Sequence, residues 1–198
     1  MVLTRKQKIS FYRNRRKVAE VIIDHVKKKR HIIFGARSLN AHFPKFLDKP
    51  TVDYDILVEK GNPKKVARRL EKKLDRKFKG NFFIVEKAKH SGTYKVKRVL
   101  GKEGIIDVSK SNGKVPTDNI KGVRYSKLSF EKGKVKQSLR DPQSKFRHDK
   151  DRERLERIRI FESLKKKRIK SQVRKRPTIK RKITTFPINF KVNPRPNF

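Results

Sequence analysis

Two aspartates stand two residues apart in the apolar stretch TVDYDILV, at Asp53 and Asp55. Because alternate residues of a strand point to the same face, we expect both carboxylates at one spot, with Val52, Tyr54 and Ile56 on the other face. Adjacent carboxylates repel each other and resist ionisation unless a cation lies between them. Such a pair suits Mg²⁺ or Mn²⁺, which prefer oxygen ligands and bind one or two carboxylates together with substrate phosphates.

A third acid, Asp107 in IIDVS, also stands among apolar residues of a predicted strand. Three acids on neighbouring strands could hold two metal ions, which would activate an attacking hydroxyl and stabilise a leaving pyrophosphate. Taken alone, an Asp-x-Asp pair is more often a solvated turn, and a single strand aspartate is usually structural. The interpretation of Asp53, Asp55 and Asp107 as metal-binding and catalytic residues therefore depends on what surrounds them.

A phosphate-binding turn is predicted upstream of these acids, in FGARS. A predicted strand ends at Gly35 and a helix begins there, so free backbone amides and the hydroxyl of Ser38 can bind phosphate oxygens. Arg37 adds a positive charge. On its own the pattern is also that of a plain helix start. The predicted triphosphate-binding residues are Gly35, Ala36, Arg37 and Ser38.

The elements that must position these residues follow from hydrophobic periodicity. Apolar residues at helical spacing predict helices over about 14–29, 35–43, 63–80, 126–139 and 149–167. Alternating β-rich runs predict strands in HIIFG, VDYDILV, FFIVEKA, TYKVKRV and GIIDVS, the last three as an antiparallel meander. The segment between GIIDVS and residue 126 is predicted to be irregular. The expected fold is therefore α+β, a mixed sheet with flanking helices, in a domain of residues 1–164.

Composition limits the class of partner. The chain has 198 residues and a formal net charge of +40, which makes polyanions the expected partners, with RNA or DNA ahead of an anionic membrane. It contains no cysteine, which excludes disulfides and thiolate zinc sites. No segment approaches the length of a membrane span or a signal peptide. We therefore expect an intracellular protein, in the cytoplasm or the nucleus or within a virus particle.

A basic, extended C-terminal tail is predicted over residues 165–198. Between Lys165 and Lys182 the sequence holds no acid, and such a run predicts contacts with phosphates or a nuclear address. The predicted nucleic-acid-binding residues are Lys165, Lys166, Lys167, Arg168, Lys170, Arg174, Lys175, Arg176, Lys180, Arg181 and Lys182. The final stretch, ITTFPINFKVNPRPNF, carries aromatic residues that could stack on bases or dock on a protein partner.

The stretch IIFGARSLNAHFPKFLDKPTVDYDILV resembles the signature of the nucleotidyltransferase superfamily, which has the DNA polymerase beta-like fold. In that family a strand leads to a Gly-Gly or Gly-Ser turn and a helix, then to a strand with Asp-x-Asp, with a third Asp on a later strand. The pattern is most similar to small members of the bacterial abortive-infection type. The likeness covers about residues 31–109, and SKFRHDKDRERLERI resembles the family's later Arg/Lys-x-Lys-Asp helix. Ala36 stands where the family often has its second glycine.

This resemblance implies that Gly35 and Ser38 contact the triphosphate, that Asp53 and Asp55 bind two Mg²⁺ or Mn²⁺ ions, and that Asp107 helps to deprotonate an acceptor hydroxyl. The implied activity is transfer of a nucleotide from a nucleoside triphosphate to an RNA or DNA acceptor, held by the basic surface and tail. A second class stays open, a basic nucleic-acid-binding or packaging protein, such as a virion component, that keeps the fold without catalysis. The acids favour the enzyme, and the charge excess favours the binding protein.

Overall fold

The structure, a computed structural model, describes Thr4 and residues 14–101 and 103–174, with side chains as far as Lys167. The chain divides into two compact units, Met1–Glu162 and Ser163–Phe198. The sheet and the cavity described below belong to the first. The predicted domain boundary at Leu164 stays a prediction. Among the described residues, no helix combines the length and the apolar composition that crossing a bilayer requires.

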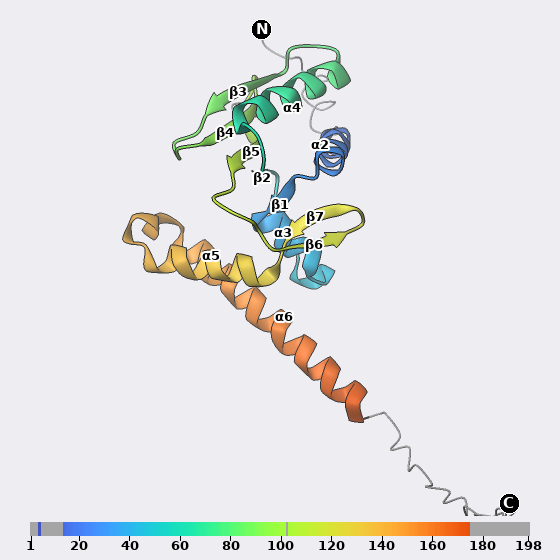
Figure 1. Ribbon diagram of the computed structural model, residues 1–198, viewed down its shortest axis with the longest axis vertical. Coiled ribbons are helices and arrows are strands. Elements are labelled where there is room, and N and C mark those ends of the chain that lie inside the picture. The colour runs from blue at the N-terminus through green and yellow to red at the C-terminus, as the bar shows by residue number, and fades with distance from the viewer. Residues whose placement is uncertain (1–3, 5–13, 102, 175–198) are drawn as a thin grey trace, which may run out of the picture. The chain divides into compact units, whose positions relative to one another are not determined.

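A seven-stranded mixed sheet organises the first unit, with the strand order β3-β4-β5-β2-β1-β7-β6 (Figure 1). The strands are β1 (Ile32–Phe34), β2 (Tyr54–Val58), β3 (Phe83–Lys87), β4 (Thr93–Arg98), β5 (Gly104–Lys110), β6 (Thr117–Ile120) and β7 (Val123–Ser126). The helices are α2 (Arg15–Lys29), α3 (Gly35–His42), α4 (Pro63–Phe78), α5 (Leu128–Arg140) and α6 (His148–Arg174), with 3-10 helices η1 (Lys45–Leu47) and η2 (Pro142–Arg147). The predicted α+β class, a mixed sheet with flanking helices, is confirmed.

One face of the sheet is apolar and is covered by α2 and α4 (Figure 1). Ile56 and Val58 of β2 are fully buried in this layer. Ile22 of α2 and Leu70 and Leu74 of α4 are fully buried in the same cluster. Because strand side chains alternate between faces, the same strand sends its other residues to the opposite side.

Local signals place several elements where the sequence predicts them. The side chain of Asn62 accepts a hydrogen bond from the amide of Lys64 at 2.8 Å, and Pro63 occupies the first turn of α4. Both features satisfy or remove amides that a helix start leaves free. The predicted meander is also confirmed, because β3, β4 and β5 pair in sequence order and antiparallel.

The segment predicted to be irregular contains a hairpin, formed by β6 and β7. Lys121 and Gly122 have positive φ values of 52° and 78°, which suit the two-residue turn of a twisted hairpin. Each strand has four residues, too few for an apolar alternation to stand out. The hairpin matters for the site because β7 pairs with β1 in parallel and ends at Ser126.

The last helix is longer than predicted. α6 continues to Arg174 instead of ending near Lys167, so the first part of the predicted extended tail is helical. Lysine and arginine are good helix formers, and no proline or glycine interrupts this part of the run. Lys165, Lys166 and Lys167 are exposed. Side chains from Arg168 onward, and the predicted contacts at Lys175, Arg176, Lys180, Arg181 and Lys182, lie outside the described part of the chain.

The apolar side chains in the first part of α6 pack inward, as the helical spacing that predicts this helix requires. Leu155 and Ile158 are buried, and the ring of Phe161 packs on that of Phe43 at 5.2 Å between centroids. Leu164 is 41% exposed, so this fourth apolar position does not share the burial of Leu155 and Ile158.

Candidate active site

The three predicted acids line one cavity, of about 550 Å³, on the sheet face that α2 and α4 do not cover. Asp55 in β2 and Asp107 in β5 are directly paired on adjacent parallel strands, which places their side chains next to each other on one face. Asp53 lies one residue before β2 and lines the same cavity. The structure therefore brings together the acids that the sequence predicts, although Asp53 precedes the strand instead of lying within it.

The carboxyl group of Asp55 is electrostatically strained. Its pKa is raised from 3.8 to about 6, first because it is buried and then because of the negative charges of Asp53 and Asp107. The positive charge of Arg154 opposes this shift. A carboxyl group that ionises reluctantly beside two other acids is one that a bound cation would stabilise.

One positive side chain already stands beside these acids. Lys95 on β4 pairs with Asp107 across the strands, and its Nζ lies 3.3 Å from Oδ2 of Asp107. In the described part of the chain, no three His, Cys, Asp or Glu side chains are grouped tightly enough to chelate an ion. The acids therefore surround the cavity without forming a finished chelate. Their chemistry nevertheless fits a hard divalent cation, since all three donors are carboxylates and Asp55 lacks a full counter-charge.

Gly35 packs directly against Asp55. Its φ is +70°, and a Cβ atom at this position would lie 2.3 Å from Oδ2 of Asp55. Both the backbone conformation and the close approach therefore require glycine. The Gly35 amide donates a hydrogen bond to Oε1 of Glu131 at 3.0 Å. The glycine turn thus shapes the acid side of the cavity.

The other predicted triphosphate-binding residues do not reach this cavity. Of the four, the described cavity lining includes Gly35 but not Ala36, Arg37 or Ser38. Ser38 is fully buried, and its hydroxyl donates to the carbonyl oxygen of Ser126 at 2.8 Å. Ser38 lies about one helical turn after Gly35 in α3. Its side chain therefore points toward β7, where α3 and β7 are in contact. A direct contact between this hydroxyl and phosphate is therefore not supported.

The side chain of Arg37 forms hydrogen bonds with the loop that precedes β2 and does not line the cavity. Its guanidinium donates hydrogen bonds to the carbonyl oxygens of Asp53 at 2.7 Å, Val52 at 3.0 Å and Thr51 at 3.1 Å. It also lies over the ring of Tyr54, 3.5 Å from the centroid. Sequence reasoning assigned this charge to phosphate because a local pattern does not show which distant carbonyls a long side chain reaches. In the structure Arg37 positions Asp53.

A fourth acid, Glu131 in the first turn of α5, was not predicted. It is 3% exposed and accepts hydrogen bonds from the Gly35 amide and the Ser126 hydroxyl. Burial raises its pKa, and these two hydrogen bonds oppose the rise. A glutamate in the first turn of a helix is common, so the sequence contains no signal that distinguishes Glu131 as a site residue. Its contacts hold the turn at Gly35 and the end of β7 together.

Positively charged side chains from the helical elements also line this cavity. They are Lys134 of α5, Arg147 of η2, and Lys150 and Arg154 of α6, and we call them the basic wall. The fully buried Asp151 pairs with Arg147 at 3.0 Å and with Arg154 at 3.4 Å, which orients both arginines. In RHDKDRER the spacing of Arg147, Lys150, Asp151 and Arg154 is that of residues on one side of a helix. That spacing is the signal by which the part of the basic wall in this stretch could have been predicted residue by residue.

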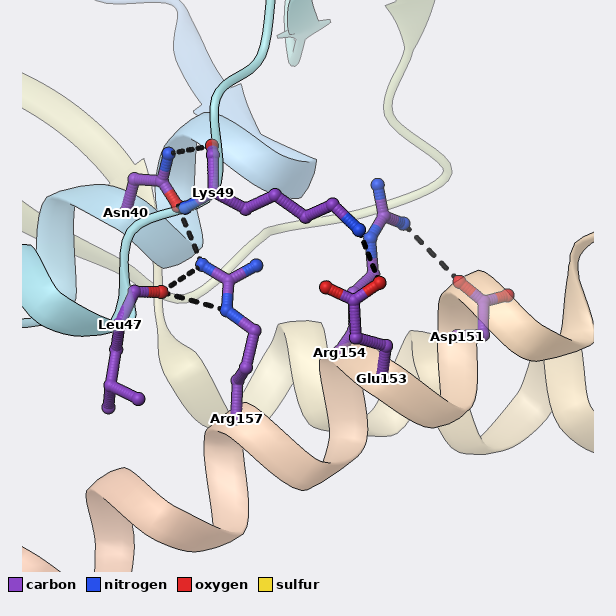
Figure 2. A network of polar contacts seen from close by, with 7 residues as sticks. All are labelled: Asn40, Leu47, Lys49, Asp151, Glu153, Arg154 and Arg157. Carbon is purple, nitrogen blue, oxygen red and sulfur yellow. Dashed lines mark hydrogen bonds and ion pairs between the residues drawn. The ribbon is translucent and has the colours of Figure 1, made fainter.

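Polar contacts anchor α6 to the segment between α3 and β2 (Figure 2). Arg157 donates to the carbonyl oxygen of Leu47 at 2.8 Å and to Oδ1 of Asn40 at 2.9 Å. Lys49 forms an ion pair with Glu153. The helix that carries part of the basic wall is thereby fixed to the segment that leads to the acids.

The structure is similar to the crystal structure of the Megavirus polyadenylate synthase, with a TM-score of 0.65 and 17% identity, over 75% of this chain and 31% of that chain. The chain thus spans about a third of the length of that protein. The crystal structure of JHP933 from Helicobacter pylori matches with a TM-score of 0.39 and 14% identity, over 70% of this chain and 58% of that chain. No protein-family model and no curated protein matches the sequence. The likeness to the polyadenylate synthase shows that the two chains share a fold, in agreement with the predicted nucleotidyltransferase-like core.

Proposed function

We propose that the chain is a metal-dependent nucleotidyltransferase, which transfers a nucleotide from a nucleoside triphosphate to an RNA or DNA acceptor. One observation carries the proposal: a single cavity has Asp53, Asp55 and Asp107 on its sheet side and the basic wall on its helical side. A triphosphate with bound divalent cations presents charges of both signs, and it is complementary to such a cavity. The nucleotidyltransferase-like fold supports this assignment.

Each side chain of the cavity has a proposed task. Asp53, Asp55 and Asp107 would hold two Mg²⁺ or Mn²⁺ ions, which supply charge neutralisation at the phosphates and activation of the attacking hydroxyl. Asp107 would also accept the proton of the acceptor hydroxyl, and Nζ of Lys95 lies 3.3 Å from its Oδ2. The basic wall binds phosphate oxygens, with two of its arginines oriented by Asp151.

The test of the enzyme is a transfer assay with labelled nucleoside triphosphates, Mg²⁺ or Mn²⁺ and oligonucleotide acceptors. Replacing Asp53, Asp55 or Asp107 singly by asparagine is expected to lower transfer about a thousandfold while the fold persists, since each removes a ligand charge. Asp149→Asn is the matched control, because this acid is almost fully exposed and pairs with Arg152. Transfer that survives all three cavity substitutions would exclude the proposed enzyme.

We also propose that the RNA or DNA acceptor is bound by the basic surface of the protein and by its tail. The first unit carries many exposed lysines and arginines, and the tail adds the predicted contacts from Lys165 to Lys182. Each phosphate neutralised contributes about −0.7 to the slope of log affinity against log salt on single strands, and about −0.9 on duplex DNA. Truncation after Leu164 is therefore expected to weaken oligonucleotide binding and flatten its salt dependence. Anisotropy titrations at several salt concentrations that give the same slope for both chains would remove the tail from the proposal.

A second candidate is a non-catalytic nucleic-acid-binding or packaging protein. Its specific support is that Arg37 and Ser38 are engaged within the fold, while the net charge is +40. A thermal melt separates the two candidates. A nucleoside triphosphate with Mg²⁺ raises the melting temperature if the folded cavity binds it, whereas a purely nucleic-acid-binding protein responds to oligonucleotide alone.

A further inference from the structure

Phe146 is an aromatic side chain that stands in solvent at the edge of the cavity. It is 81% exposed, and it lines the same cavity as the three acids. Among the large apolar side chains found exposed in the described residues, it is the one that lines this cavity. Removing the apolar surface of a phenylalanine ring from water is favourable, so its ring offers a binding surface that the fold itself leaves unused.

The neighbours of Phe146 are cations. Arg147 follows it directly in η2, and Lys150 and Arg154 line the same cavity from α6. Asp151 holds Arg147 at 3.0 Å, which fixes the end of the short helix that carries the ring. An apolar flat surface and a group of phosphate-binding cations thus occur side by side. The ligand class that combines a flat apolar ring with a chain of phosphates is a nucleotide.

We propose that Phe146 is the stacking surface for the base of the incoming nucleoside triphosphate, an inference that rests on the proposed function. Stacking of a base on an aromatic ring strengthens binding by about tenfold or more. A phenyl ring offers no hydrogen-bond donor or acceptor, so it contacts the face of the base and does not read its edge. The subsite therefore accepts all four bases, with purines held more tightly because their larger rings overlap more of the phenyl surface.

The test compares ATP with inorganic tripolyphosphate, which has the phosphates but no base. Both, and separately an oligonucleotide, are titrated in Mg²⁺ into the full chain and into Phe146→Ala, Phe146→Trp and Phe46→Ala variants. Phe46 is the matched control, since it is 73% exposed, lies in a 3-10 helix and is not part of the described cavity lining. Phe146→Ala is expected to weaken ATP binding about tenfold and to leave tripolyphosphate binding unchanged. Phe146→Trp retains ATP affinity, and Phe46→Ala changes neither.

Three results would overturn the inference. They are unchanged ATP affinity in Phe146→Ala, equal weakening of ATP and tripolyphosphate, and weakening of oligonucleotide binding alone, which would assign the ring to the acceptor. The proposed function fails separately. If the wild-type chain binds ATP through Phe146 but transfers no label, the proposed enzyme is excluded and the stacking site is retained. If the wild-type chain is active but Phe146→Ala keeps full ATP affinity, the stacking site is excluded and the enzyme is retained. If the wild-type chain does not bind ATP, both proposals are excluded.

Discussion

The two faces of β2 differ sharply although they alternate along five residues. Ile56 and Val58 enter an apolar layer in which every contact favours the folded state. Asp55, between Tyr54 and Ile56, faces a cavity with two further acids, and its raised pKa shows that its charge costs free energy there. The difference teaches that at Asp55 the strand carries its chemistry on the face opposite to Ile56 and Val58, although Leu57 on that same face is buried in a second apolar cluster. Stability and activity should therefore respond in opposite directions to substitution of Asp55.

The largest effect is expected for Asp55→Asn. Transfer should fall about a thousandfold because a ligand charge is lost, while the free energy of unfolding at pH 8 rises by about 1 to 3 kcal/mol because a buried, repelled charge is removed. Transfer assays and urea titrations measure the two quantities. A variant that loses both activity and stability would show that Asp55 is a structural residue, and it would break the proposed division between the faces.

Ile56→Ala tests the other face of the strand. This side chain is fully buried, and removing it is expected to lower the free energy of unfolding by about 3 kcal/mol through lost burial and a residual cavity. Affinity for ATP, measured at a temperature where the variant stays folded, should change less than twofold. A large loss of affinity with unchanged stability would contradict the assignment of this face to the core.

A pair of glycine substitutions separates backbone strain from the contact with Asp55. Gly35 and Gly122 both have positive φ, +70° and +78°, but a Cβ on Gly122 would meet Cε of Lys27 at 3.6 Å, an ordinary contact. Gly122→Ala is expected to cost about 1 kcal/mol. Gly35→Ala should cost more and should also weaken ATP binding, because the Asp55 carboxyl group must move. Equal effects of the two substitutions on ATP affinity would count against a turn at Gly35 that shapes the cavity.

The pH dependence of stability gives the smallest and most specific comparison. His25 of α2 is buried on the core side, and burial, aided by the charges of Lys73 and His31, lowers its pKa from 6.5 to about 4. Its contribution to stability is therefore present above pH 6.5 and lost as the pH falls through 4. The contribution of Asp55 to stability has the opposite pH dependence. It is fully present below pH 3.8 and is lost as the pH rises through about 6, where the folded protein loses this proton.

Between about pH 4 and 6 the two groups thus oppose each other. The slope of the unfolding free energy against pH should become more positive in Asp55→Asn and more negative in His25→Leu, each by up to about 1.4 kcal/mol per pH unit relative to the wild type. Glu131, whose pKa is also raised, is present in all three proteins, and its charge is one of those that raise the pKa of Asp55. Denaturant titrations at several pH values measure the slopes. Shifts of the same sign in both variants would mean that one of the two assignments is wrong.

The sequence predicted the acids and their strands because both signals are local. Alternating apolar residues around Asp55 indicate one buried face, and the spacing of Asp53 and Asp55 places them close together wherever the strand lies. The basic wall was indicated by a pattern but not assigned residue by residue. The role of Glu131 and the contacts of Arg37 could not be predicted, because each depends on a partner that only folding brings close. Glu131 binds the amide of Gly35, which is 96 residues away in the sequence. Arg37 binds carbonyl oxygens of the loop that precedes β2.

The hairpin of β6 and β7 was missed for a related reason. Its strands are short and largely polar, so they are held by pairing, β7 with β1 and β6 with β7, more than by any apolar pattern of their own. The Lys121-Gly122 turn was the available signal. A search for two-residue turns between short segments would have found it.

The position of β2 in the strand order has a kinetic consequence. β5 and β2 occupy the third and fourth places of the seven-stranded sheet, with further strands on either side. Amides in such central strands exchange with solvent through opening of the whole domain, whereas edge strands such as β3 and β6 open locally. The segment that carries Asp55 is therefore expected to be among the last to exchange its amide protons. The lifetime of the assembled acid cluster then equals the lifetime of the folded domain itself.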